Sequence, residues 1–273
     1  MPYFTTSDGT ALYYTDQGSG QPIVLSHGWP LSSDAWQVEL KLFADAGYRA
    51  IAHDRRGHGR SAKTYTGNDM ETYARDLAEL IDSLNLRDLV VIGHSTGGGE
   101  VVKYAATYGK DRVAKVVTAG AVPPIMVKSD SNPEGTPIEV FDGIRQGVLK
   151  DRSQFWKDLS EPFFGANRQG SNVSQGAKDD FWRQGMLVNL AAAYDCVKAF
   201  SETDQTEDLK AIDVPIMIAQ GDDDQIVPIA AAAMKSIKLV KDGTLKVYPG
   251  APHGIYGAYQ EALDDDILKF LST

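Results

Sequence analysis

Residues 93 to 97 read Gly-His-Ser-Thr-Gly and match the pattern Gly-x-Ser-x-Gly. They lie between an apolar run, 89–92, and a stretch of helical character, 100–108. A strand, a tight turn and a helix in this order can hold a serine exposed on a sharp turn as a nucleophile. Neighbouring backbone crowds the positions two before and two after such a serine, and Gly93 and Gly97 leave room there. We predict that Ser95 is a nucleophile; the alternative is an ordinary glycine-rich turn.

A serine nucleophile requires a base, and the chain offers five histidines: His27, His53, His58, His94 and His253. His94 is adjacent to the serine, and its side chain is expected to point elsewhere. His27, His53 and His58 lie at a strand end or in turn-rich sequence, which indicates structural roles. His253 follows the last predicted strand, so its imidazole would lie on a loop at the carboxyl edge of the sheet. We predict that His253 is the base.

The base requires an orienting acid. Asp222, Asp223 and Asp224 directly follow the predicted strand 214–219. Serine, then acid, then histidine is a known order of such a triad along a chain. No further oxygen ligands follow at the spacing of a calcium loop, which argues against a cation site. The composition of the segment leaves the choice among the three aspartates open.

An attacked carbonyl develops negative charge on its oxygen, which backbone N–H groups stabilise. The N–H of Thr96, the residue after the nucleophile, is one expected donor. The second is expected in the loop 26–30 after an early strand. Trp29 can donate its N–H there, whereas Pro30 has none.

These residues must be positioned by a sheet. The predicted strands are 11–15, 23–26, 49–52, 89–92, 113–118, 214–219 and 244–248. Helical patterns alternate with them at 33–46, at 73–84 and from about residue 256, which is typical of parallel α/β architecture. In the first helix, Ser33 is the expected N-cap and Gly47 the stop. In the last, the run 264–266 of three aspartates is expected mostly on the solvent side.

No strand is predicted between Pro123 and about Thr206. Helical segments and loops fill this stretch, with aromatic residues throughout: Phe141, Phe155, Trp156, Phe163, Phe164, Phe181, Trp182, Tyr194 and Phe200. The economical interpretation is one core, 1–122 and 207–273, with a helical cap, 123–206, inserted before the last two strands. We expect most of these aromatic residues to pack inside the cap.

Composition excludes several function classes. The 273 residues contain 27 Lys and Arg against 37 Asp and Glu, a net charge of -10, which disfavours nucleic acid and anionic membranes as partners. The single cysteine, Cys196, cannot form an intrachain disulfide or a multi-cysteine zinc site. Neither a signal peptide nor an apolar run of roughly 20 residues is visible, so a cytoplasmic location is expected.

The chain resembles the α/β-hydrolase superfamily over nearly its whole length, and closely resembles the cofactor-free bacterial haloperoxidase and aryl esterase group. The motifs that carry the resemblance are 26–30 (SHGWP), 54–61 (DRRGHGRS), 93–101 (GHSTGGGEV), 194–197 (YDCV), 221–228 (GDDDQIVP) and 251–254 (APHG). In that group the second aspartate of the fifth motif is the triad acid. This implies Asp224, with Asp222 as a structural neighbour and Asp223 at a variable position.

The resemblance also implies that the N–H groups of Trp29 and Thr96 form the oxyanion hole. Esterase members often carry Phe and Met where this chain has His94 and Thr96, so their acyl preference does not transfer.

The implied activity is hydrolysis of small or aryl esters through an acyl-enzyme on Ser95, with water as acyl acceptor. Hydrogen peroxide in place of water gives a peracid that oxidises halide, without haem, metal or any other cofactor. Homo-oligomers are common among relatives.

Two alternatives stay open. One is hydrolysis of γ-lactams or other amides on the same triad. The other is a small-molecule receptor that bears a triad without using it. Haloalkane dehalogenation is disfavoured, because it requires a carboxylate where Ser95 stands.

Overall fold

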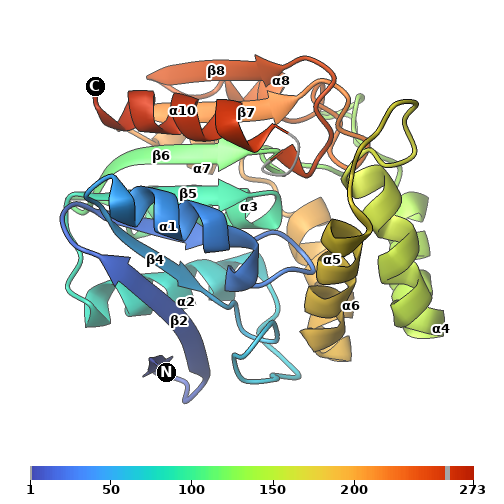
Figure 1. The fold of residues 1–273 in the computed structure, drawn as a ribbon, viewed down its shortest axis with the longest axis horizontal. Helices are drawn as coiled ribbons and strands as arrows, with labels where there is room; N and C mark the ends of the chain where they lie inside the picture. Colours follow the sequence, from blue (N-terminus) through green and yellow to red (C-terminus); the bar gives the residue numbers. More distant parts are fainter. Residues whose placement is uncertain (1, 256–258) are drawn as a thin grey trace.

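The structure is a computed structural model that describes residues 2–255 and 259–273. Its strands are β1 (Tyr3–Thr5), β2 (Ala11–Gly18), β3 (Pro22–Ser26), β4 (Arg49–His53), β5 (Leu89–His94), β6 (Val113–Ala119), β7 (Ile216–Gly221) and β8 (Gly243–Tyr248). They form one eight-stranded sheet in the order β1-β2-β4-β3-β5-β6-β7-β8 (Figure 1). β3 to β8 pair in parallel, and β1 and β2 are antiparallel. The predicted fold class, with a mostly parallel sheet, is confirmed.

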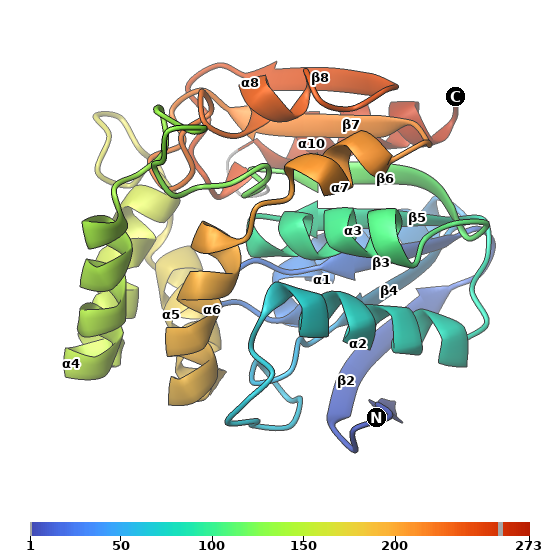
Figure 2. The ribbon, with the colours of Figure 1, turned by 180° about the vertical axis from the view of Figure 1, so that it is seen from behind.

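The helices are α1 (Gln37–Asp45), α2 (Met70–Ser83), α3 (Thr96–Thr107), α4 (Ile138–Phe163), α5 (Gln175–Leu187), α6 (Leu190–Glu202), α7 (Thr206–Ala211), α8 (Ala233–Ser236) and α10 (Gln260–Leu271). α1 and α10 cover one face of the sheet, and α2, α3, α7 and α8 the other (Figures 1 and 2). Because both faces are covered, the central strands are continuous apolar runs, and every residue of β5 is buried. Among the described residues, no helix is long and apolar enough to cross a membrane.

All seven predicted strands are present, and β1 was missed. This edge strand has only three residues, too few for an alternating pattern to show. It is held by its pairing with β2, where the rings of Tyr3 and Tyr13 lie 5.6 Å apart, edge to face.

The expected N-cap Ser33 is wrong by one residue. The segment starts with one 3-10 turn, Ser33–Trp36, whose cap is Ser32, because the Ser32 hydroxyl accepts from the Asp34 N–H (3.3 Å). The Ser33 hydroxyl donates instead to Asp54 Oδ1 (2.6 Å). The Ser33 side chain therefore does not cap the helix as the local sequence pattern predicted, because it is hydrogen-bonded to Asp54, which is distant in sequence. Gly47, with φ of 90°, follows the end of α1 as expected.

The last helix corrects a second expectation. α10 begins at Gln260, and the expected start near residue 256 lies outside the described residues. Asp264 is buried rather than on the solvent side, because it lies three residues before Ile267 and so shares the apolar stripe. Asp265 is exposed, and Asp266 accepts a hydrogen bond from the Tyr248 hydroxyl (3.1 Å).

Residues 123–206 contain α4, α5 and α6 and, apart from isolated bridges, no strand. These helices stand beside the carboxyl ends of β5, β6 and β7 (Figure 1). α4 contains one non-helical residue, Asp151, where two helices meet at a kink. The inserted helices share an apolar cluster with Trp29 and Leu31 of the loop after β3. The division into a core and a cap stays a prediction.

Candidate active site

Ser95 occupies the turn between β5 and α3 with φ of 55° and ψ of −121°. Positive φ is strained for a residue with a side chain and persists only where the surroundings enforce it. A Cβ on Gly93 would lie 2.2 Å from the Gly97 carbonyl oxygen, and one on Gly97 would lie 2.2 Å from the Ser26 carbonyl oxygen. The expected crowding on both sides of the serine is confirmed.

His253 lies on the loop after β8, with its ring almost fully buried. Its Nδ1 lies 2.8 Å from Asp224 Oδ2. Because a carboxylate faces Nδ1, this nitrogen carries the proton, and Nε2 is the basic nitrogen of the neutral ring. The ring packs edge-on against Phe163 of α4 (centroids 5.1 Å apart), and the N–H of Gly254 donates to the Phe163 carbonyl oxygen (2.8 Å). The loop that carries His253, here called the histidine loop, is thus hydrogen-bonded to the end of α4.

Asp224 follows β7, and four donors converge on its carboxylate. Oδ1 accepts the backbone N–H groups of Ile226 (2.9 Å) and Val227 (2.8 Å). Oδ2 accepts from the Gln220 amide (3.2 Å) as well as from His253. These bonds fix the plane of the carboxylate and therefore the orientation of the imidazole.

The other two aspartates have different partners. Asp222 Oδ1 accepts the N–H of Gly250 (2.6 Å), which ties the ends of β7 and β8 together. Asp223 forms an exposed ion pair with Arg168. Of the three carboxylates that the composition could not distinguish, only that of Asp224 contacts His253.

Trp29 and Thr96 reach the same site from two elements. Thr96 is the first residue of α3, and Trp29 lies in the loop after β3. Both line the cavity that Ser95 and His253 also line. The Trp29 indole donates to the Ala193 carbonyl oxygen of α6 (3.2 Å), which holds the side chain against the inserted helices. The N-terminus of a helix favours negative charge, so the arrangement suits a developing oxyanion.

The cavity has a volume of about 250 Å³ and mainly apolar walls. The inserted segment contributes aromatic and aliphatic residues to it: Phe141, Phe155, Phe163, Phe200, Met126, Val140, Ile144 and Leu159. The remaining aromatic residues of the segment do not line it, and Trp156 and Phe181 are fully buried in the apolar cluster. A more open groove of about 620 Å³, with several charged side chains at its edge, lies between the loop 66–69, α4 and α6, but none of the predicted site residues lines it.

His94 has a contact that the sequence did not indicate. Its ring lies outside the cavity lining, but Nε2 is 3.0 Å from the carbonyl oxygen of His253, and the two rings are 4.8 Å apart. The carbonyl accepts, so Nε2 carries the proton. Burial, with a smaller contribution from His253, holds the pKa of His94 well below 6.5. The ring is therefore neutral at neutral pH.

A buried polar network lies beneath the site and was also missed. Glu100 of α3 accepts from Arg55 Nε (2.7 Å) and from the Ser26 hydroxyl (2.7 Å), and lies 2.9 Å from His53 Nε2. Burial alone would raise the pKa of Glu100, but Arg55 and His53 lower it to about 2. His53 was expected to have a structural role, and Arg55 lies in the motif 54–61, but no local pattern predicted their contacts with Glu100.

The family model described as "alpha/beta hydrolase fold" matches residues 21–257. The chain is 56% identical to a non-heme haloperoxidase of Rhodococcus erythropolis and 48% identical to a bifunctional esterase/perhydrolase of Acinetobacter calcoaceticus, over the full length of both partners in each case. Among solved structures, a bromoperoxidase from Bacillus anthracis has a TM-score of 0.94 at 35% identity, covering 97% of this chain and 96% of its own. An esterase from Exiguobacterium antarcticum has a TM-score of 0.94 at 28% identity, covering 99% of each chain. The chain therefore belongs to the α/β-hydrolase family, in the group of non-haem haloperoxidases and esterases, and is a hydrolase.

Proposed function

We propose that the chain is a serine carboxylesterase for small or aryl esters, with Ser95 as nucleophile, His253 as base and Asp224 as orienting acid. The observation that carries the proposal is the 2.8 Å contact between His253 Nδ1 and Asp224 Oδ2 at the cavity that Ser95 also lines. The names of the esterase and esterase/perhydrolase relatives support the same class of reaction.

In the proposed reaction, Ser95 Oγ attacks the ester carbonyl while His253 Nε2 takes its proton. The negative charge on the former carbonyl oxygen is stabilised by the N–H groups of Trp29 and Thr96. The tetrahedral intermediate then collapses, and His253 gives the proton to the departing alcohol. Water attacks the remaining acyl-enzyme with the same proton relay, which releases the carboxylic acid and restores Ser95.

Hydrogen peroxide in the place of water makes the second step a perhydrolysis. Its oxygen attacks the acyl carbonyl while His253 accepts its proton; the bond from the acyl carbon to Ser95 Oγ then breaks, His253 returns the proton to Oγ, and a peracid is released. The peracid then oxidises halide in solution, away from the protein. The haloperoxidase names of the relatives support this side reaction.

The size of the cavity indicates the class of substrate. A cavity of about 150 Å³ accommodates benzene, so a cavity of about 250 Å³ accepts an aryl ring with a short substituent, or a short acyl chain. Its apolar walls come largely from the inserted helices. We therefore propose that residues 123–206 act as a cap that selects the acyl or aryl group.

We further propose that the protein is located in the cytoplasm, acts on a small-molecule substrate and assembles as a homo-oligomer. The net charge of -10 supports a small substrate over nucleic acid or an anionic membrane. A single, buried cysteine is in keeping with a reducing compartment. Light scattering after size-exclusion chromatography tests the assembly.

Replacing Ser95 by Ala tests the nucleophile. Turnover of p-nitrophenyl acetate should disappear, and a fluorophosphonate should label the wild type at Ser95 but not Ser95→Ala. Ser272→Ala is the control, because that hydroxyl donates to the carbonyl oxygen of Lys269 at the C-terminal end of α10 and does not line the cavity. Activity retained by Ser95→Ala would rule out the proposal.

A further inference from the structure

We propose that Arg55 is a positioning residue for the reaction, which sets the loop that carries the Trp29 N–H relative to the helix that carries the Thr96 N–H. This inference rests on the proposed function, because it concerns the two donors expected to stabilise the oxyanion. Arg55 itself lies outside the cavity lining and acts through the backbone.

Arg55 is hydrogen-bonded to two consecutive residues, Ser26 at the end of β3 and His27 in the loop after it. Its Nη2 donates to the His27 carbonyl oxygen (2.7 Å) and to the Ser26 hydroxyl (3.2 Å). Its backbone N–H donates to His27 Nε2 (3.0 Å), while His27 Nδ1 contacts the Gly28 carbonyl oxygen (2.8 Å). The residues immediately before Trp29 are thus held through both main-chain and side-chain atoms.

The other side of the guanidinium is anchored on α3. Arg55 Nε donates to Glu100 Oε2 (2.7 Å), and the same oxygen accepts from the Ser26 hydroxyl (2.7 Å). Glu100 lies one helical turn after Thr96, so its position is rigidly related to the Thr96 N–H. Arg55 and Glu100 therefore connect the two elements that supply the donors.

The surroundings leave the guanidinium little freedom. The Arg55 and Glu100 side chains are 1% and 0% exposed, so solvent does not weaken their attraction. The Tyr73 ring lies beneath the guanidinium, with Arg55 Cζ 5.0 Å from its centroid. A planar fork that bonds a carboxylate, a carbonyl and a hydroxyl at once has a geometry that an ammonium group cannot reproduce.

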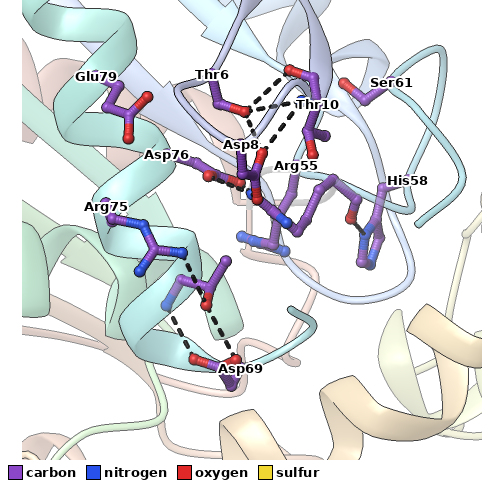
Figure 3. Close-up of polar contacts among 12 residues, drawn as sticks. Thr6, Asp8, Thr10, Arg55, His58, Ser61, Asp69, Arg75, Asp76 and Glu79 are labelled. Carbon is purple, nitrogen blue, oxygen red and sulfur yellow. Dashed lines mark hydrogen bonds and ion pairs between the residues drawn. The ribbon is translucent and has the colours of Figure 1, made fainter. Parts of the chain in front are cut away.

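The adjacent Arg56 provides a matched control. It is also buried and also paired, but its Nε and Nη2 bind Asp76 (2.5 and 2.6 Å) and Nη2 binds Asp8 (2.9 Å). Figure 3 shows Asp8 close to Asp76, with Asp8 also held by Thr6 and Thr10. Replacing either arginine by lysine disturbs a buried ion pair, but only Arg55 contacts the loop of the oxyanion donor.

The decisive comparison is Arg55→Lys against Arg56→Lys in the full chain. Rates are expressed per active site, counted by fluorophosphonate labelling, so that loss of folded protein does not lower them. A misplaced donor of this kind costs about 10- to 100-fold in rate. We expect kcat for p-nitrophenyl acetate to fall by that factor in Arg55→Lys with KM changed less than about threefold, and both constants to stay near wild type in Arg56→Lys.

An arylboronic acid supplies the second measurement. It forms a tetrahedral adduct with a reactive serine and places an oxygen where the oxyanion forms, so its Ki should rise in Arg55→Lys by the factor that kcat/KM falls. A role confined to folding would reduce the number of active sites and leave this Ki unchanged.

Ser26→Ala, which removes one hydroxyl of the same link, covers the case in which Arg55→Lys does not fold. It should show a smaller change in the same direction in both kcat and Ki. If kcat per active site and the boronic acid Ki are both unchanged in the folded variants, the positioning role of Arg55 is overturned, but the proposed function is not. A wild type that neither fluorophosphonate nor boronic acid affects would instead overturn the proposed function, and this inference with it.

Discussion

The imidazole of His94 donates from Nε2 to the carbonyl oxygen of His253, so the residue before the proposed nucleophile holds the backbone of the proposed base. The bond is buried, and the two rings pack at 4.8 Å. The turn between β5 and α3 and the loop that carries His253 therefore form one unit, although His94 and His253 are 159 residues apart in the chain.

Replacement of His94 by Phe should weaken this unit. The carbonyl oxygen of His253 keeps a second donor, the Ile255 N–H (2.8 Å), but loses one buried hydrogen bond, which costs about 0.5–1.5 kcal/mol of unfolding free energy. His94→Gln can still present an N–H near the same point and should lose less. Urea unfolding of both variants, with kcat measured alongside, tests the bond; equal stability of the two would contradict it.

Asp224→Asn should lower kcat by about 10³- to 10⁴-fold, because an amide in place of the carboxylate favours the wrong imidazole tautomer and no longer stabilises its charged form. Asp223→Asn is the control, since Asp223 forms an exposed ion pair with Arg168. Ester turnover of both variants is measured at neutral pH. A similar loss in both would remove Asp224 from its proposed role.

Two buried carboxyl groups should make stability depend on pH. Burial raises the pKa of Glu39 in α1 to about 8, with a contribution from Asp264, and burial raises the pKa of Asp264 to about 6. Neither Glu39 oxygen has a hydrogen-bond partner among the described residues. A raised acid pKa means that the folded state binds protons more tightly. The stability that Glu39 contributes is therefore full below about pH 4.5 and declines as the pH rises to about 8, and the contribution of Asp264 declines between about pH 3.8 and about pH 6.

The decline attributable to Glu39 should amount to about 2–4 kcal/mol between pH 5 and pH 9. Glu39→Gln should flatten the curve of unfolding free energy against pH, whereas the exposed Glu139→Gln should not. Urea titrations at several pH values provide the measurement. A curve of unchanged slope in Glu39→Gln would refute the assignment.

Gly97→Ala should abolish activity and destabilise the fold by roughly 3 kcal/mol or more, because the added methyl would meet the Ser26 carbonyl oxygen at 2.2 Å and backbone cannot move aside cheaply. Gly143→Ala is the contrasting change. Nothing lies within 4 Å of a Cβ there, and alanine in a helix is more stable than glycine by about 0.5–1 kcal/mol. Thermal unfolding should therefore shift in opposite directions.

Much of the architecture was predictable, because a buried parallel strand requires a continuous apolar run and few other elements produce one. The chain positions of Ser95 and His253 followed from the same strands, since side chains just past parallel strands meet at one edge. The choice of Asp224 over Asp222 and Asp223 did not follow from composition, because it depends on which carboxylate turns toward the imidazole. Only the resemblance to a family indicated it.

The features that escaped prediction depend on partners distant in sequence. Glu100 meets Arg55 and Ser26 across 45 and 74 residues, and no local pattern marks such a pair. The burial of Asp264 was missed for a different reason. Three consecutive aspartates suggest solvent, but a helix turns about 100° per residue, so one of three neighbours can face inward.

The hydrogen bond between Gly254 and the last residue of α4 gives the two parts of that helix unequal freedom. Phe163 is tied to the histidine loop, and the kink at Asp151 separates this end from the first half of α4. To accept esters of bulkier acids, Val140 or Ile144 should therefore be replaced by a smaller residue, because both line the cavity and precede the kink. Substitutions in the part of α4 after Asp151 would also move the His253 imidazole, because Phe163 is bonded to its loop. Selectivity can therefore be changed without changing the rate only by substitutions before the kink.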